Sequence, residues 1–312
     1  MVEAVVIFGA TGFVGRNLVA HLVKKVGRIV AVSRSGAPVA GALECAAMDR
    51  LTDIASLPKE TILVNLAAQR YDASRFEMAQ SDILTANVEI ANAVYRFCVE
   101  RGLREVRAAS SVAVYPAELA VLDDKYPVDL NAPPHPNESF YAWSKRWGEI
   151  LAGLHRDRYG VSTVSFRLSN PYGPHDSTDL ARAHVVPAFV LRALTTADSF
   201  VIKGAPTVRR DFIYVGDVCE VFEASLAWRE RTMAMNLCAG RTHTLYELAE
   251  TILKLVSDKR PIIASDVNVQ GVVARVSTNE TVIEATGKSN FTSLAEGLAP
   301  TVEWYAHALG GG

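Results

Sequence analysis

Short apolar runs alternate with amphipathic stretches through the first two thirds of the chain. The apolar runs predict buried strands at Ala4–Phe8, Arg28–Ser33, Leu43–Ala47, Ile62–Asn65, Glu105–Ser110 and Thr163–Leu168. The amphipathic stretches predict helices, the clearest being Gly12–Val26, Ser81–Arg101 and Tyr141–Tyr159. Strands that alternate with helices indicate βαβ units, and therefore a parallel sheet covered on both faces. We expect an α/β fold with a doubly wound parallel sheet of the Rossmann type.

The pattern changes near residue 171, where prolines interrupt the chain and the segments become shorter. Helices are expected there at Leu245–Val256 and Leu294–Leu309. We expect residues 1–170 to form a dinucleotide-binding domain and residues 171–312 to form a smaller C-terminal α/β substrate lobe. The two are interleaved, because the strand-to-helix junction at Arg210–Val218 predicts that segments around 210–240 return to the first domain. The Pro-, Asp- and Asn-rich stretch 116–137 predicts a surface excursion.

Composition narrows the class of protein. The net charge over the 312 residues is −2, which argues against a nucleic-acid binder, because such proteins usually carry a basic face. No apolar stretch reaches the roughly 18 residues that a membrane span requires. The four cysteines form no C-x-x-C pair, and the N-terminus has neither a basic region nor a cleavage site. These features predict a cytoplasmic protein with no metal site and no nucleic-acid or membrane partner.

The first predicted strand leads into a glycine-rich turn with the spacing G-x-x-G-x-x-G. Glycines allow the backbone to turn tightly and to approach a pyrophosphate, and the helix that follows offers free N–H groups. The alternative is a glycine turn without a ligand, but the strand before it and the helix after it favour a phosphate cradle. We expect cofactor contacts from Gly9, Thr11, Gly12, Phe13, Val14 and Gly15.

Three further positions bear on the cofactor. Arg34 ends the second predicted strand, where an Asp or Glu would bind the ribose of NAD and an Arg accommodates the 2′-phosphate of NADP. The cofactor is therefore NADP or NAD, with NADP slightly favoured, although an ordinary solvated Arg fits equally well. Asp49 could accept a hydrogen bond from the adenine, or it is a plain surface residue. Leu66, Ala67 and Ala68 follow the fourth strand and would let the backbone lie against the cofactor.

A candidate chemical site lies further along the chain. Tyr141 and Lys145 are four residues apart, so on one helix they share a face. An ammonium group near a phenol stabilises the phenolate and lowers its pKa, which suits Tyr141 to exchange a proton with a carbonyl or carbinol oxygen. Ser111 follows the fifth predicted strand, where its hydroxyl could orient that oxygen. The pair by itself is common on solvated helices, but its placement after the glycine cradle makes the prediction specific.

With these motifs in view, the chain resembles an extended short-chain dehydrogenase/reductase of the NAD-dependent epimerase/dehydratase family. The resemblance runs nearly from end to end. The motifs that carry it are the glycine loop, Asn65-Leu66-Ala67-Ala68, Asn87 in Thr85-Ala86-Asn87-Val88, Ser110-Ser111 ahead of Tyr115, Tyr141-x-x-x-Lys145, Arg167 to Pro174, Arg210 to Val215, and Asn236-Leu237. They are specific to the family and much less specific to a substrate.

The resemblance implies roles for these residues. Ser111, Tyr141 and Lys145 would be catalytic, and Tyr141, Lys145 and Asn87 would also contact the cofactor. Asn170 and Arg210 would bind the diphosphate of a nucleotide-diphosphate sugar, since a guanidinium donates two parallel hydrogen bonds. A structural ion-pair network within Arg209-Arg210-Asp211 is the alternative for Arg210. The family also implies a homodimer through a four-helix bundle formed by Ser81–Arg101 and Tyr141–Tyr159.

Departures from the family pattern narrow the reaction. Dehydratases of the family place an Asp-Glu pair where this chain has Val112 and Ala113, so dehydration is disfavoured. The segment from Tyr172 to Pro187 resembles the GDP-fucose synthase branch, and His184 fits the histidine of that branch. Ala113, however, replaces its cysteine, which makes double epimerisation doubtful. His184 would be an acid or a substrate contact, with packing of a loop as the alternative.

Oxidation and reduction at one sugar carbon remain. We place first an NAD(P)-dependent epimerase that acts by transient oxidation at the sugar 4-position, and second an NADP-dependent sugar-nucleotide 4-ketoreductase. A regulator that binds the cofactor without turnover is a third hypothesis, which the complete set of Ser111, Tyr141 and Lys145 disfavours.

Overall fold

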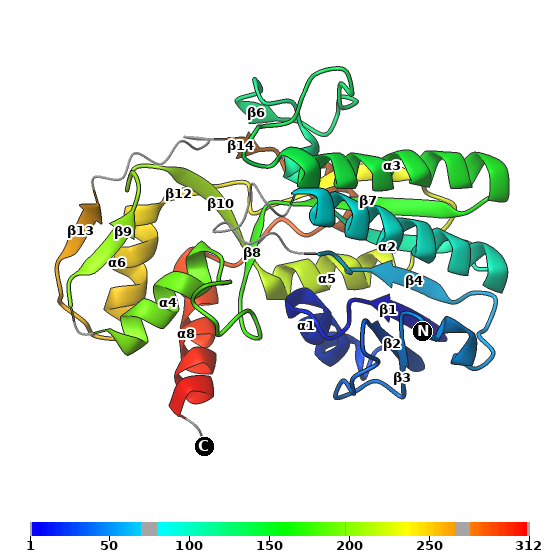
Figure 1. Ribbon diagram of the computed structural model, residues 1–312, viewed down its shortest axis with the longest axis horizontal. Helices are drawn as coiled ribbons and strands as arrows, with labels where there is room; N and C mark the ends of the chain where they lie inside the picture. Colours follow the sequence, from blue (N-terminus) through cyan, green and yellow to red (C-terminus); the bar gives the residue numbers. More distant parts are fainter. Residues whose placement is uncertain (1, 70–79, 197, 266–274, 311–312) are drawn as a thin grey trace.

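The computed structural model describes residues 2–69, 80–196, 198–265 and 275–310. Its largest sheet is parallel and has seven strands in the order β11-β7-β5-β4-β1-β2-β3 (Figure 1). The strands are β1 Ala4–Phe8, β2 Arg28–Ser33, β3 Glu44–Ala47, β4 Ile62–Asn65, β5 Glu105–Ser111, β7 Ser162–Leu168 and β11 Met233–Leu237. The six strands expected from the sequence are confirmed with end shifts of at most one residue. The doubly wound α/β fold is thereby confirmed.

Helices cover both faces of this sheet. On one face lie α1 (Phe13–Leu22) and α5 (Val215–Ser225), and on the other lie α2 (Gln80–Arg101) and α3 (Ser139–Tyr159). The alternation of side chains along β1 produces the two layers, because Val5 and Ile7 join one hydrophobic cluster while Val6 and Phe8 join the other. A strand that is apolar at every position is thus explained by burial on both sides.

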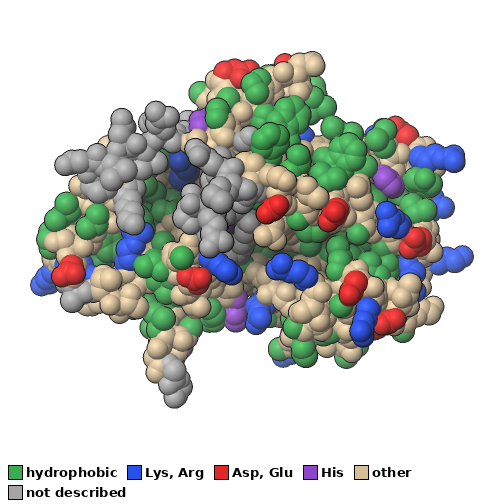
Figure 2. Space-filling view, in the orientation of Figure 1, with side chains coloured by type: hydrophobic (Ala, Val, Ile, Leu, Met, Phe, Trp, Pro, Cys, Tyr) green, Lys and Arg blue, Asp and Glu red, His purple; other side chains and the backbone are tan. Residues whose placement is uncertain are grey.

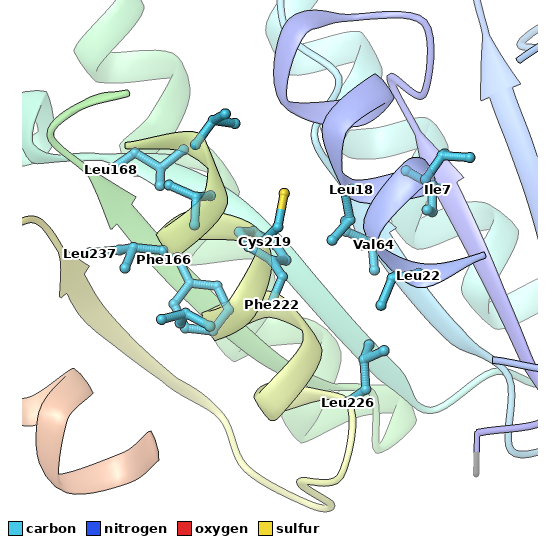
Figure 3. Packing of buried hydrophobic residues seen from close by; sticks show 14 of the residues in the cluster. Ile7, Leu18, Leu22, Val64, Phe166, Leu168, Cys219, Phe222, Leu226 and Leu237 are labelled. Carbon is cyan, nitrogen blue, oxygen red and sulfur yellow. The ribbon is translucent and has the colours of Figure 1, made fainter. Parts of the chain in front are cut away.

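The cluster beneath α1 and α5 illustrates the packing (Figure 3). Phe166 of β7 meets Phe222 of α5 with ring centroids 4.8 Å apart, and Leu18 of α1 packs in the same cluster. These side chains are completely shielded from water. Burial of each side chain of this size contributes roughly 1.5–3 kcal/mol, so this layer holds the helices against the sheet.

One helix ends earlier than the sequence predicts, and another ends where it predicts. The first helix was expected to reach Val26, but α1 ends at Leu22 and the following residues form a turn. Val26 is still buried, so its apolar character reflects packing of the turn and not helix. Helix α3 ends where expected, because Gly160 adopts a left-handed conformation with φ of 65° and caps the last carbonyl groups.

The C-terminal part forms a second cluster around three helices, α4 (Val185–Thr195), α6 (Leu245–Leu255) and α8 (Leu294–Gly310). Three small sheets accompany them. They comprise β8 Asn170–Tyr172, β10 Arg209–Tyr214 and β12 Thr242–Thr244; β9 Phe200–Lys203 and β13 Ile262–Ser265; and β6 Val121–Leu122 and β14 Val276–Ser277. A short helix α7 (Glu280–Thr286) and two 3-10 turns (Leu51–Asp53 and Val112–Val114) complete the elements of the described residues.

The chain crosses between the two parts more than once. After β9 and β10 it returns to the large sheet, where β11 pairs in parallel with β7 from Met233↔Val164 to Leu237↔Leu168. The excursion at 116–137 contains β6, which pairs with β14 from far along the chain. Across the residues that the structure describes, no helix combines the length and the apolar character needed to cross a membrane.

Candidate active site

A cavity of about 900 Å³ lies at the carboxyl ends of the strands of the large sheet and extends to the C-terminal part. This is the edge where doubly wound sheets bind ligands. Most residues expected to form the site line this one cavity. They are Gly9, Thr11, Gly12, Phe13, Val14, Gly15, Arg34, Leu66, Ala67, Ala68, Ser111, Tyr141, Lys145, Asn170, His184 and Arg210.

Two of the expected cofactor residues do not line the cavity. Asp49 is exposed just beyond Met48, which does line it. Asn87 is buried, and its side-chain amide exchanges hydrogen bonds with the backbone of Gln69, accepting from N–H at 2.9 Å and donating to C=O at 3.2 Å. Gln69 lines the cavity, so Asn87 supports the loop after β4 from behind.

The glycine loop brings β1, α1 and the loop after β4 into close contact. Gly9 has a φ of +81°, and a Cβ there would lie 2.6 Å from the amide nitrogen of Ala67. A Cβ on Gly15 would lie 2.2 Å from the carbonyl oxygen of Gly9. Helix α1 begins at Phe13 without a side-chain cap, and its first residues line the cavity. Uncapped N–H groups and the positive end of the helix fit an anionic group such as a pyrophosphate.

One end of the cavity contains the arginine that the sequence associates with the cofactor ribose. Val32, Ser33, Arg34 and Met48 line it, and no carboxylate of the described residues joins them there. The hydroxyl of Ser33 is buried and has no hydrogen-bond partner within the described part of the chain. A guanidinium and an unused hydroxyl suit an anion, whereas the ribose of NAD usually meets a carboxylate.

The three candidate catalytic residues converge at the middle of the cavity. Ser111 is the last residue of β5, and its Oγ accepts a hydrogen bond from the N–H of Ala113 at 3.1 Å. Tyr141 and Lys145 share the cavity face of α3, with the ammonium nitrogen 5.6 Å from the centre of the Tyr141 ring. Lys145 Nζ donates to the carbonyl oxygen of Ala109 at 2.9 Å. Burial lowers the pKa of Lys145 to about 8, and the charge of Glu149 acts in the opposite direction.

Apolar residues adjoin this trio. Val112 and Ala113, directly after Ser111, line the cavity together with Leu122 of β6. None of these three side chains can exchange a proton.

The residues expected to bind substrate come from separate elements. Asn170 on β8 donates from Nδ2 to the carbonyl oxygen of Asp211 at 2.8 Å. Arg210 on β10 pairs across the sheet with His243, and its Nη1 donates to the carbonyl oxygen of Arg209 at 2.8 Å. His184 lies at the residue before α4.

The alternative role for Arg210 is an ion-pair network with Asp211, so the hydrogen-bond partners of Asp211 bear on it. The Asp211 carboxylate accepts hydrogen bonds from Ser169 Oγ at 2.8 Å and from the backbone N–H groups of Ala239 and Arg241. Burial raises the pKa of Asp211, while these hydrogen bonds act to lower it. Arg209 donates to Thr242. In these contacts the Asp211 carboxylate is held by neutral donors.

The sequence analysis missed a third arginine of the cavity, after Arg34 and Arg210. Arg275 lines it, donates from Nη2 to the carbonyl oxygen of Ala117 at 3.2 Å and lies 3.3 Å from a carboxylate oxygen of Glu138. Burial and the charges of Arg275 and Arg210 lower the pKa of His135, while the charge of Glu138 acts to raise it. No motif marks Arg275, which directly precedes β14, and the parallel pairing of β14 with β6 brings this segment to the cavity.

Comparisons with known proteins identify relatives of this chain. Residues 5–238 match the model of the NAD dependent epimerase/dehydratase family. A dTDP-4-dehydro-6-deoxy-D-allose reductase of Streptomyces bikiniensis is 27% identical over 98% of this chain and 97% of its own. A GDP-L-fucose synthase of Dictyostelium discoideum is 23% identical over 79% and 78%. The structure of a UDP-glucose 4-epimerase of Thermotoga maritima is similar in fold, with a TM-score of 0.82, 23% identity and coverage of 98% and 100%.

The chain belongs to the NAD dependent epimerase/dehydratase family, because the family model matches well over half of it. It is an NAD(P)-dependent enzyme that modifies sugar nucleotides, and both epimerases and 4-ketoreductases are among its relatives. Among the described residues, no group of three or more His, Cys, Asp or Glu side chains gathers as a metal site would require.

Proposed function

We propose that this member of the family is an NADP-dependent sugar-nucleotide reductase that converts a 4-keto sugar into the alcohol. The observation that carries the proposal is a single proton-transfer trio, Ser111, Tyr141 and Lys145, in one cavity with Arg34. The nicotinamide, when bound, supplies hydride to the sugar carbon. The side chains of this chain supply the proton and its geometry.

Each member of the trio has a separate task in this proposal. Tyr141 donates its phenolic proton to the oxygen that becomes the alcohol, since a phenol near that oxygen is a general acid. Lys145 stabilises the phenolate that remains, because its ammonium lies beside the ring. Ser111 donates a hydrogen bond to the substrate oxygen, and its own orientation is fixed by the N–H of Ala113.

Reduction is favoured over epimerisation, which we had placed first from the sequence, on two grounds. Arg34 and Ser33 suit the 2′-phosphate of NADP, the cofactor suited to net reduction. The relatives that span nearly the whole chain at 27% identity include 4-keto sugar reductases. An epimerase would use the same trio, but it would regenerate its cofactor in every cycle.

The walls of the cavity support a substrate of one class. Val112, Ala113 and Leu122 make the wall beside Ser111 apolar, which suits a 6-deoxy sugar whose methyl group needs no hydrogen bond. Arg210, Arg275 and Asn170 are proposed to hold the diphosphate, and His184 is proposed as a substrate contact. In this arrangement residues 1–170 with the returning segments around 210–240 form the dinucleotide-binding domain, which also presents Ser111, Asn170 and Arg210 to the substrate. Residues 171–312 form the substrate lobe.

The test is a turnover assay with a panel of 4-keto-6-deoxy sugar nucleotides and reduced cofactor. We expect stoichiometric loss of NADPH, faster than loss of NADH, with one alcohol product. Interconversion of 4-epimers without added cofactor would replace the proposal with the epimerase. Cofactor binding with no turnover on any sugar nucleotide would favour the regulator.

We also propose a homodimer in which α3 contributes an apolar stripe. Trp143, Trp147, Ile150 and Leu154 are all exposed and recur at helical spacing. They lie on the side of α3 away from Tyr141 and Lys145, and Figure 2 shows hydrophobic side chains gathered over this helix. Exposed stripes of this kind mark interaction sites. Trp147→Glu should convert the dimer into a monomer by light scattering, and a monomeric unaltered protein would remove the proposal.

A further inference from the structure

Behind the trio, a buried ion pair joins α3 to the large sheet. Glu149 lies four residues after Lys145 and eight after Tyr141 on α3, so the three side chains follow one face of the helix. Arg167 of β7 donates from Nε to Glu149 Oε1 at 3.0 Å and from its Nη2 to Oε2 at 2.8 Å. The two side chains are only 7% and 16% exposed. A two-point contact between a guanidinium and a carboxylate fixes both distance and direction.

The same pair anchors the Ser111 segment on both sides. Ser110, directly before Ser111, donates from Oγ to Glu149 Oε1 at 2.6 Å. Arg167 Nη1 donates to the hydroxyl oxygen of Tyr115 at 2.9 Å, and that hydroxyl donates to Asn236 Oδ1 at 2.9 Å. The ion pair therefore sets the position of the segment from Ser110 to Tyr115 relative to the helix that carries Tyr141 and Lys145.

Glu149 also shares a small cavity with Lys145. The cavity, of about 40 Å³, lies between α2, α3 and the sheet, and its polar walls include Ser144 of α3 and Tyr95 and Asn87 of α2. Across the main cavity, α2 contributes Glu89. Glu149 does not line the main cavity, so any effect that it has on the reacting atoms passes through Lys145 and the Ser111 segment.

The groups near Glu149 differ in how burial and its carboxylate affect their charge. Burial acts to lower the pKa of Arg167, but the hydrogen bonds and charge of Glu149 raise it, so this guanidinium stays charged. Burial lowers the pKa of Lys145 and Glu149 opposes that shift. Tyr95 is neutral at working pH, because burial raises its pKa. Glu149 is thus the carboxylate, within the wall of the small cavity, that favours an ammonium at Lys145.

We propose that Glu149 is a positioning residue for the reaction, which holds the Ser111 segment against α3 and keeps Lys145 protonated beside Tyr141. The inference rests on the proposed function, because a charged Lys145 matters only if Tyr141 exchanges a proton. Without the carboxylate, the ammonium would lose its proton at lower pH and the phenolate would lose its stabilising neighbour.

The test follows the affinity of the whole protein for NADPH, and kcat/KM, as functions of pH. In the unaltered protein we expect both to decline as the pH rises through about 8, because Lys145 loses its charge there. In Glu149→Gln, which keeps the shape and removes the charge, the midpoint should move to lower pH by about one unit. Lys145→Met should abolish this decline in NADPH affinity, which would assign it to Lys145.

A merely structural role predicts a different result. Glu149→Asp retains the charge, so its midpoint should stay near that of the unaltered protein even if its rate is lower. A structural role would lower the rate of Glu149→Gln and Glu149→Asp at every pH and leave both midpoints unchanged. An unchanged midpoint in folded Glu149→Gln, or no decline near pH 8 in the unaltered protein, overturns the proposal.

Removal of Glu149 alone leaves the buried Arg167 without its carboxylate partner, so a second variant covers the case in which Glu149→Gln does not fold. The paired change Glu149→Leu with Arg167→Leu then replaces it, since buried ion pairs are often exchanged for apolar residues without loss of stability. An unchanged midpoint in that variant also overturns the proposal. NADPH binding requires no sugar, so a normal midpoint shift without turnover would refute only the proposed reductase.

Discussion

The two ends of the main cavity are built in different ways. The dinucleotide end is formed largely by residues 9–34, which are close in sequence and present backbone N–H groups and glycines. The end proposed for the sugar gathers Ser111 of β5, Tyr141 of α3, Arg210 of β10 and Arg275, directly before β14, and presents side chains. Contacts made by backbone groups are unchanged by most substitutions, but an added Cβ on a glycine can displace them. Each contact at the sugar end is made by a side chain, so a single substitution can remove it. The first end should therefore respond to steric changes and the second to chemical ones.

The largest effect is expected from Tyr141→Phe, which removes one oxygen at the junction of the two ends. Turnover should fall by about 10²–10⁴-fold because the general acid is lost. Cofactor affinity should hardly change, since the glycine loop is untouched. Tyr159→Phe, at the exposed end of the same helix, is the matched control and should leave the rate unaltered. A normal rate in Tyr141→Phe would remove this residue from the mechanism.

Gly15→Ala tests the steric sensitivity of the dinucleotide end. The new Cβ would lie 2.2 Å from the carbonyl oxygen of Gly9, so α1 must shift. We expect a loss of about 1–3 kcal/mol in the free energy of unfolding, measured with denaturant, and weaker cofactor binding.

Gly153→Ala is the control for this change, because nothing lies within 4 Å of its Cβ on α3. It should stabilise the protein by about 0.4–1 kcal/mol, since alanine restricts the unfolded chain more than glycine does. Equal effects from the two substitutions would contradict the close-packed loop.

Arg275→Ala tests the chemical sensitivity of the sugar end. A hydrogen bond to a charged group contributes about 1.5–3 kcal/mol, so KM for the sugar nucleotide should rise by roughly tenfold or more. Cofactor affinity should stay the same, because Arg275 lies at the other end of the cavity. Arg182→Ala, an exposed residue outside the cavity, serves as the control in the same steady-state assay. An unchanged KM would place the diphosphate elsewhere.

The smallest effect is expected from Arg34→Ala. Arg34 is the charged side chain that we propose contacts the cofactor at the dinucleotide end, where backbone groups make most of the other contacts. The affinity for NADP should fall by about tenfold and that for NAD should fall less, because only NADP carries the 2′-phosphate. Arg50→Ala, exposed and outside the cavity, should alter neither affinity in the same titration. An equal loss of affinity for both cofactors would contradict the proposed preference for NADP.

The sequence predicted the sheet and the cofactor loop well, because both depend on patterns within a few residues. It was less able to place polar residues that no pattern constrains. The motif around Asn87 predicts a cofactor contact, and only the structure shows that its amide holds the backbone of Gln69. Arg275 lies in a stretch without a motif, and only the pairing of β14 with β6 brings its segment to the cavity.

The order of strands and helices, the glycine turn and the spacing of Tyr141 and Lys145 were determined by the sequence itself. Hydrophobic periodicity and backbone sterics act over short distances, so they can be read directly from neighbouring residues. Tertiary structure alone decided which distant side chains meet: Arg275 with Glu138, and Glu149 with Arg167 and the Ser111 segment. Such contacts depend on how strands and helices pack in space, and that packing is a property of the whole chain.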